Sequence, residues 1–293
     1  KKEEMKMKVI SLLSMKGGTA KTTTAVNLAA GLANNGLKTL LIDADAQGNA
    51  TAYFSKEKDY LTSLVDNSEL PYREAMQSTI ASNKEYAFDT YEVLMEPSCI
   101  KEAIYPTKVE QLYIMPSQNH KLILADKNIT LDTKKPQQTR FKKALRELRH
   151  EFDYVVIDNA PTSNTVTINS LIASDLIIIP VKPGGDEIEG LASTIEDVET
   201  IKDNFDVEVD FKILLTMFHK KTDGTFNRKT ENQEYDVLHQ IFEKQMLNSV
   251  IRYQDGIVTK SSIEKQIVIN TSTKVSDDYK ALVNELIGGE DKE

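Results

Sequence analysis

A glycine-containing loop near the start of the chain constrains the fold more than any other segment. Residues 14–24 read SMKGGTAKTTT; the apolar run 9–13 precedes them and a helix-forming segment, 25–33, follows. A short apolar run suits a buried parallel strand, and strand, glycine turn and helix in this order are typical of a phosphate-binding loop. In such a loop main-chain N–H groups and the helix N-terminus contact phosphate oxygens. We therefore predict that Lys21 reaches the terminal phosphates of a nucleotide and that Thr22 supplies an oxygen to Mg²⁺.

Two further apolar runs end in carboxylates, and both are predicted strands. One is followed by the acids Asp43 and Asp45, and the run 152–158 ends in Asp158. The carboxyl ends of parallel strands meet at the edge where open α/β sheets bind ligands, so these acids are expected near the loop. Phosphoryl transfer needs a metal ion to offset charge on the phosphate oxygens, and a strand-end acid can hold that ion. Asp158 is the first candidate for this role.

The alternation of strand-like and helix-like segments along all 293 residues predicts the fold class. We expect one α/β domain, residues 1–293, with a mostly parallel, doubly wound sheet flanked by helices, and an insertion of short helices and loop near 59–86. The amphipathic stretch 138–152 is expected to expose its basic residues to solvent. Further strands are predicted at 38–42, 112–117, 176–181 and 211–218, and further helices at 188–204 and 279–286.

Composition narrows the function classes. A net charge of −9 argues against a uniformly basic nucleic-acid coat, although a local basic face remains compatible with it. The lone Cys99 cannot form an internal disulfide, and with no recognisable signal peptide it agrees with a reducing cytoplasm. The four histidines lack metal-ligand spacing, and no apolar run is long enough to span a bilayer.

The loop resembles the deviant Walker A motif of the ParA/MinD ATPases, because Lys16-Gly-Gly-x-x-Lys21-Thr-Thr follows their order. Residues 41–51 resemble the ParA Walker A′ motif, with Ala46 in place of its proline, and Asp158 stands where Walker B has its acid. The resemblance implies a deviant Walker P-loop NTPase that uses ATP and Mg²⁺.

The resemblance also implies residue roles. Lys16 would reach the phosphates of the partner subunit in an ATP-dependent homodimer, Lys21 would neutralise developing charge, and Asp45 would orient the attacking water. Thr22, Asp43 and Asp158 would manage Mg²⁺. The nucleotide-binding residues implied are Lys16, Gly17, Gly18, Thr19, Ala20, Lys21, Thr22, Thr23, Met217 and Pro183. For Met217 and Pro183 core packing is an equally good interpretation.

The function implied is that of a plasmid or chromosome partition ATPase. Such a protein is cytoplasmic and nucleoid-associated, binds DNA non-specifically as a dimer, and hydrolyses ATP to ADP and phosphate slowly until a centromere-binding ParB-type partner stimulates it. Candidate DNA contacts are Lys220, Lys221, Arg228, Arg252, Lys260 and Lys265. Solvated side chains are an equally good interpretation of these residues.

Two alternatives remain open at this point. A MinD-like membrane-surface ATPase shares the loop, but the acidic end of the chain does not suit anionic lipid. A nucleotide-binding switch with negligible hydrolysis is suggested by Ala20, which stands where the family has glycine. We expect Ala20 to hold an α-like conformation, so that the substitution affects turnover more than binding.

Overall fold

A mixed, mostly parallel sheet forms the centre of the computed structural model, which describes residues 7–55, 69–71, 74, 86–257, 261 and 264–288. Within these residues the sheet has eight strands in the order β3-β4-β2-β5-β1-β6-β7-β8, and only β3 runs antiparallel to its neighbour. The strands are β1 (Lys8–Leu12), β2 (Thr39–Ala44), β3 (Tyr105–Pro106), β4 (Leu112–Met115), β5 (Tyr154–Asn159), β6 (Leu176–Val181), β7 (Asp210–Phe218) and β8 (Met246–Arg252).

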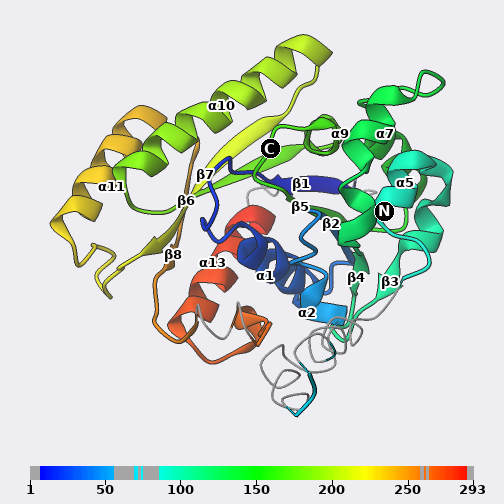
Figure 1. Cartoon of the computed structure of the whole chain (residues 1–293). Coiled ribbons are helices and arrows are strands. Elements are labelled where there is room, and N and C mark those ends of the chain that lie inside the picture. The colour runs from blue at the N-terminus through cyan, green and yellow to red at the C-terminus, as the bar shows by residue number, and fades with distance from the viewer. Residues whose placement is uncertain are drawn as a thin grey trace, which may run out of the picture.

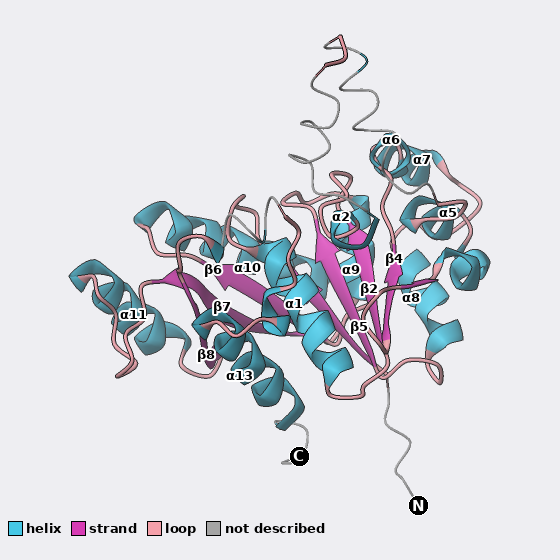
Figure 2. Ribbon diagram, turned by 90° about the horizontal axis from the view of Figure 1, so that it is seen from below, coloured by secondary structure: helices cyan, strands magenta, loops and turns pink. Residues whose placement is uncertain are grey.

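Helices cover both faces of this sheet, as Figures 1 and 2 show. One face packs on α1 (Lys21–Asn34) and α13 (Lys274–Gly288), and Figure 2 views the sheet from this side. The opposite face packs on two groups of helices. These are α5 (Thr90–Met95), α7 (Ala125–Leu131) and α8 (Arg140–Leu145), and then α9 (Thr165–Ile172), α10 (Gly185–Phe205) and α11 (Lys229–Phe242). Shorter elements are α2 (Ala52–Ser55), α6 (Asn119–Leu122) and the 3₁₀ segments Pro97–Ala103, Arg146–Leu148 and Val268–Asn270.

The central strands are buried on both faces, which explains why they read as continuous apolar runs in the sequence. Every residue of β2, β5 and β6 is buried. A strand covered by helices on both sides gains from apolar residues at every position rather than at alternate ones. Polar residues appear where these strands end, and that edge carries the candidate site.

The fold class predicted from the sequence is confirmed, and so are the strands at 176–181 and 211–218. Sequence reasoning did not predict α11 or β8, because α11 is mostly polar and β8 contains Asn248 and Ser249. Most of the insertion expected near 59–86 lies outside the described residues.

No helix in the described part of the chain combines the length and the apolar character that a membrane-spanning segment requires.

Candidate functional site

The loop between β1 and α1 lies at the carboxyl edge of the sheet, with β5 and β6 on either side of β1. A hydrogen bond from β7 holds its main chain in place: the Thr216 hydroxyl donates to the Thr19 carbonyl at 3.0 Å. Helix α1 begins at Lys21, and its first hydrogen bond runs from the Thr24 N–H to the Ala20 carbonyl at 2.8 Å. No acidic residue occupies the first turn of α1, so the helix N-terminus keeps its affinity for an anion.

The conformation of Ala20 differs from the α-like one expected from the sequence. Its φ is 62° and its ψ is 25°, in the left-handed region that favours glycine. A left-handed conformation costs an L-residue about 1–2 kcal/mol, because Cβ comes too close to the following carbonyl oxygen. The substitution of glycine by Ala20 therefore leaves the loop geometry in place but adds strain to it.

The carboxylates of Asp43 and Asp158 face each other at the ends of adjacent strands. In the parallel register Asp158 of β5 pairs with Leu12 of β1 and with Asp43 of β2. Side chains two residues apart share a face, and Leu41 and Val156 belong to the cluster that packs on α1. The two acids therefore point to the α1 side of the sheet, where α1 starts.

This carboxylate pair is buried and carries an unusual charge state. Burial and the neighbouring Asp158 raise the pKa of Asp43 to about 8, although hydrogen bonds from Thr51 and Asp45 oppose the rise. Burial also raises the pKa of Asp158 to about 6, against the opposing influence of Lys21 and the Thr22 hydroxyl. The two acids thus lack enough positive charge to ionise together.

The donor set around Asp158 fits a divalent cation that binds through few protein ligands. Neither oxygen of Asp158 has a hydrogen-bond partner of standard geometry among the described residues, and the Thr19 hydroxyl also lacks one. Asp43, in contrast, accepts hydrogen bonds from the Thr51 N–H and hydroxyl, both at 2.7 Å. Within the described residues no group of three His, Cys, Asp or Glu side chains forms a complete metal site. A site with so few protein ligands suits Mg²⁺, which keeps water and phosphate oxygens as its other ligands.

Asp45 follows the end of β2 and lies at the entrance to the same site. Its N–H donates to Oδ1 of Asp43 at 3.2 Å, and its own Oδ1 accepts the Gln47 N–H at 2.9 Å. Asp45 is largely buried but lines a cavity that also contains the loop. Asp43 and Asp158 do not line this cavity, because they lie deeper at the strand ends.

The cavity beside the loop has a volume of about 480 Å³, and its walls combine polar and apolar side chains. Of the residues implied to bind nucleotide, those from Gly17 to Thr23 line it, as does Met217 at the end of β7. Lys16 and Pro183 do not. Pro183 lies in the turn between β6 and α10. The apolar and aromatic part of the lining comes from side chains that the sequence did not single out for binding, namely Tyr53, Pro161, Ile251, Ile257, Val268, Val275 and Tyr279.

The structure brings part of the candidate DNA contacts together at one cavity. Lys220, Lys221 and Arg252 line a second cavity of about 480 Å³, together with Lys274, which sequence reasoning missed. Lys265 instead lines the cavity beside the loop, with its Nζ 5.4 Å from the centre of the Tyr53 ring.

The two remaining candidates stand apart from that second cavity. Arg228 precedes α11 and lies 3.8 Å from the Glu231 carboxylate. Lys260 lies outside the described residues. Arg252 is also committed to an ion pair, because its guanidinium contacts both carboxylate oxygens of Asp278 at 2.6 and 2.8 Å.

One further cation near the loop escaped sequence reasoning. The Lys182 Nζ lies 3.8 Å from the position that a Cβ on Gly18 would occupy, and it pairs with Glu187 of α10 at 3.4 Å. The sequence indicates only a turn at this position. The signal that could have located Lys182 is its place directly after β6, the strand next to β1.

The fold and the loop together define a P-loop nucleotide-binding protein whose loop carries a second lysine. Comparisons agree with this class. A family model described as an AAA domain matches residues 7–213. The chromosome partitioning protein ParA of Myxococcus xanthus is 28% identical over 282 residues, which cover 96% of this chain and 88% of the relative.

Two more comparisons refine the class. The sporulation initiation inhibitor protein Soj of Bacillus subtilis is 32% identical over 216 residues, covering 73% of this chain and 74% of Soj. A solved structure of a McdA variant from Cyanothece in complex with ATP shares the fold with a TM-score of 0.76, at 18% identity and 96% coverage of both chains. The chain belongs to the ParA-type ATPases of the ParA/MinD superfamily.

Proposed function

We propose that this chain is a partition ATPase, acting as one ATPase domain over residues 1–293, that uses bound ATP to form a dimer on DNA. The observation that carries the proposal is the pair of buried carboxylates, Asp43 and Asp158, which face the N-terminus of α1 and whose raised pKa values the nearby Lys21 offsets only in part. Membership of the ParA-type family and the partitioning function named for a relative support it.

ATP and Mg²⁺ are the cofactors that the site fits. The main chain of residues 17–23 and the Lys21 ammonium would hold the phosphates, and apolar side chains of the cavity wall would contact the base. Thr22 and Asp158 would hold Mg²⁺, with Asp43 supporting that shell from behind. When bound, Mg²⁺ neutralises charge on the β- and γ-phosphate oxygens.

Hydrolysis would follow from the position of Asp45 in the wall of the cavity. A water oriented by Asp45 would attack the γ-phosphorus, the bond to the β-phosphate oxygen would break, and ADP and inorganic phosphate would leave. Lys21 would stabilise the charge that develops on the leaving group. A nucleotide-binding switch with negligible hydrolysis is the competing function, because Ala20 strains the loop. Phosphate release that Asp45→Ala abolishes would decide for the ATPase.

Dimerisation would depend on Lys16, which does not line the cavity of its own subunit. We expect ATP to convert the wild-type protein from monomer to dimer, and Lys16→Ala to weaken that dimer by about tenfold or more, since a hydrogen bond to a charged group is lost in each site. Light scattering with ATP, with ADP and without nucleotide measures this. A Lys16→Ala protein that dimerises normally with ATP would contradict the proposed role of Lys16.

DNA binding would use the second cavity, which is lined by Lys220, Lys221, Arg252 and Lys274. Lys221 is exposed. Since each phosphate contact releases a counterion, we expect Lys221→Ala to weaken binding to DNA of any sequence and to lower the slope of log K against log salt by about one.

The control is Lys142→Ala, which removes an exposed lysine on α8, away from this cavity. Fluorescence anisotropy with ATP at several salt concentrations measures how each variant binds a DNA duplex that lacks a centromere sequence. Equal slopes for wild type and Lys221→Ala would remove the second cavity from the proposal. Such DNA contacts would place the protein on the nucleoid. A ParB-type partner would stimulate ATP hydrolysis and thereby the release of the protein from DNA.

A further inference from the structure

Lys16 lies against α10 of its own subunit, at the one buried glycine of that helix. A Cβ added to Gly190 would lie 2.4 Å from Cγ of Lys16, 3.0 Å from its Cε and 3.3 Å from its Cδ. The alkyl stem of Lys16 therefore occupies the space that any other residue at position 190 would fill. Glycine inside a helix is destabilising relative to alanine, so this helix tolerates a cost that makes room for the lysine.

The main chain next to Lys16 is held by the same turn of α10. The Met15 N–H donates a hydrogen bond to the Thr194 hydroxyl at 3.2 Å, and that hydroxyl donates to the Gly190 carbonyl at 2.7 Å. Thr194 is fully buried. On the other side, the Lys16 N–H donates to the Ser14 hydroxyl at 3.3 Å. Position 194 thus fixes the backbone of the segment, and position 190 fixes the direction of its side chain.

Within the described part of the chain, the head group of Lys16 has no partner. Among the described residues, no carboxylate lies within ion-pairing distance of its Nζ and no oxygen accepts a hydrogen bond from it. Lys182, in the turn directly after β6, is by contrast paired with Glu187. A long cation with a packed stem and an unpaired head group is arranged to contact an anion that the subunit does not itself provide.

We propose that Gly190 and Thr194 are positioning residues that pre-organise Lys16 for the phosphate groups of a nucleotide held by a second copy of this chain. The inference rests on the proposed function, because it assumes that Lys16 acts across an ATP dimer. An immobilised lysine loses rotamer freedom on binding, and packing its stem on α10 in the free subunit removes much of that loss in advance. A symmetric dimer has two such lysines, so the effect counts twice.

The test compares three substitutions on α10. Gly190→Ala places a methyl group where the stem of Lys16 lies, and Thr194→Val removes the acceptor of the Met15 N–H while keeping the volume. Gly185→Ala is the matched control, because it adds the same methyl group to the same helix with no atom within 4 Å. Thr194→Ser keeps the hydroxyl and tests whether the hydrogen bond matters rather than the shape.

Sedimentation velocity with ATP gives the dimer dissociation constant, and a fluorescent ATP analogue at low protein concentration gives the nucleotide affinity of the monomer. We expect Gly190→Ala and Thr194→Val to raise the dimer constant about tenfold, as expected for two side chains that lose their pre-organisation, with an unchanged monomer affinity. Gly185→Ala and Thr194→Ser should dimerise like wild type. Resistance of Gly190→Ala to urea should equal or exceed that of wild type, which excludes misfolding as the cause.

A Lys16→Ala background completes the design. If Gly190 acts through Lys16, then Gly190→Ala should not weaken the dimer further once Lys16 is already alanine. If the wild type dimerises with ATP and Gly190→Ala dimerises equally well or more tightly, this inference is wrong while the proposed function stands. A wild-type protein that stays monomeric with ATP would instead overturn the proposed function on which the inference rests.

Discussion

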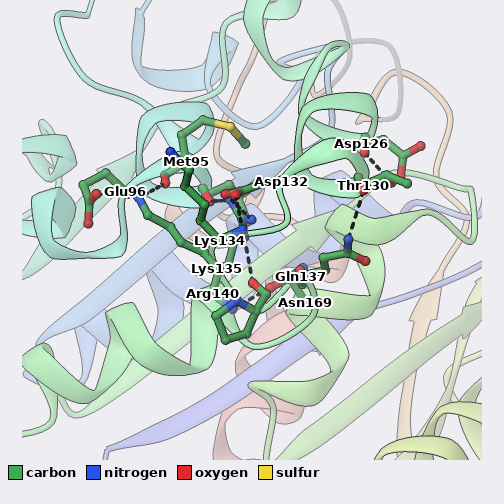
Figure 3. A network of polar contacts seen from close by, with 12 residues as sticks. Met95, Glu96, Asp126, Thr130, Asp132, Lys134, Lys135, Gln137, Arg140 and Asn169 are labelled. Atoms are coloured by element: carbon green, nitrogen blue, oxygen red, sulfur yellow. Dashed lines mark hydrogen bonds and ion pairs between the residues drawn. The ribbon is translucent and has the colours of Figure 1, made fainter.

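Replacing Arg140 by methionine is expected to lower the free energy of unfolding by about 1–3 kcal/mol, which is typical when buried acceptors lose their hydrogen-bond donor. Arg140 is 2% exposed, and its guanidinium makes three contacts, of which the one to Asp132 can be followed in Figure 3. It donates to the Leu94 carbonyl at 2.9 Å, to the Pro136 carbonyl at 2.9 Å and to the Asp132 carboxylate at 2.8 Å. Methionine fills similar space but leaves the two carbonyls without a donor.

Urea unfolding at equilibrium measures this loss, and two variants control it. Lys142→Ala removes an exposed cation from the same helix and should change stability little. Arg140→Lys keeps the charge but not the planar fork, so it should lose most of the stability that methionine loses. If Arg140→Lys were as stable as wild type, charge rather than the geometry of the three contacts would explain the network.

The Arg140 network joins helices that pack on the same face of the sheet. Its contacts connect the end of α5 with the segment before α8, and its own N–H donates to the Asn169 side chain on α9 at 2.8 Å. Helix α9 follows Asp158 after a short loop. Arg140 lines neither of the two cavities, so we assign it no contact with nucleotide or DNA.

Arg140 also shows where sequence reasoning fails. The pattern of the stretch 138–152 predicts that its basic residues face solvent, and for Lys142 and Lys143 this is confirmed. For Arg140 it is wrong, because two of the guanidinium's acceptors are main-chain carbonyls. A carbonyl is present at every residue and leaves no sequence signature, so a buried arginine that binds carbonyls cannot be distinguished from a solvated one by periodicity.

The strand-end acids were predictable for the opposite reason. An apolar run marks a buried parallel strand, and the first acid after it must lie at the ligand-binding edge, which places Asp43 and Asp158 together without any knowledge of their partners. The conformation of Ala20 and the space at Gly190 were not predictable. Both depend on how distant segments pack, and neither residue type specifies that packing.

Asp158→Asn is expected to stabilise the protein without nucleotide and to remove the effect of Mg²⁺ on its stability. Asp158 has a folded-state pKa of about 6, above its ordinary value of 3.8, and Asp43 has one of about 8. A carboxyl group with a raised pKa binds its proton more tightly in the folded state, so stability falls as pH rises from about 4 to about 8. At pH 8 the variant should gain about 1–3 kcal/mol, because one buried charge and its repulsion of Asp43 are gone.

Thermal and urea unfolding at pH 5 and pH 8, each with and without Mg²⁺ and ATP, measure both effects. For the wild type, ATP with Mg²⁺ at about 100 times the dissociation constant should add about 2.7 kcal/mol. Asp158→Asn should keep part of the ATP effect through Lys21 and the loop but lose the part that depends on Mg²⁺, because asparagine offers a neutral ligand. Asp210→Asn, an exposed carboxylate at the start of β7, should change neither.

The two halves of this prediction separate stability from metal binding. A variant that is less stable than wild type at pH 8 would mean that the Asp158 carboxylate stabilises the fold by more than its repulsion of Asp43 destabilises it. A variant that is more stable yet still responds to Mg²⁺ would move the metal ligand from Asp158 to Asp43. If the carboxylate pair serves the metal, the same variant should show both effects: it should be more stable than wild type without nucleotide and should lose the stabilisation by Mg²⁺. Both results together would show that the buried charge of Asp158 destabilises the free protein and is offset only by a bound cation.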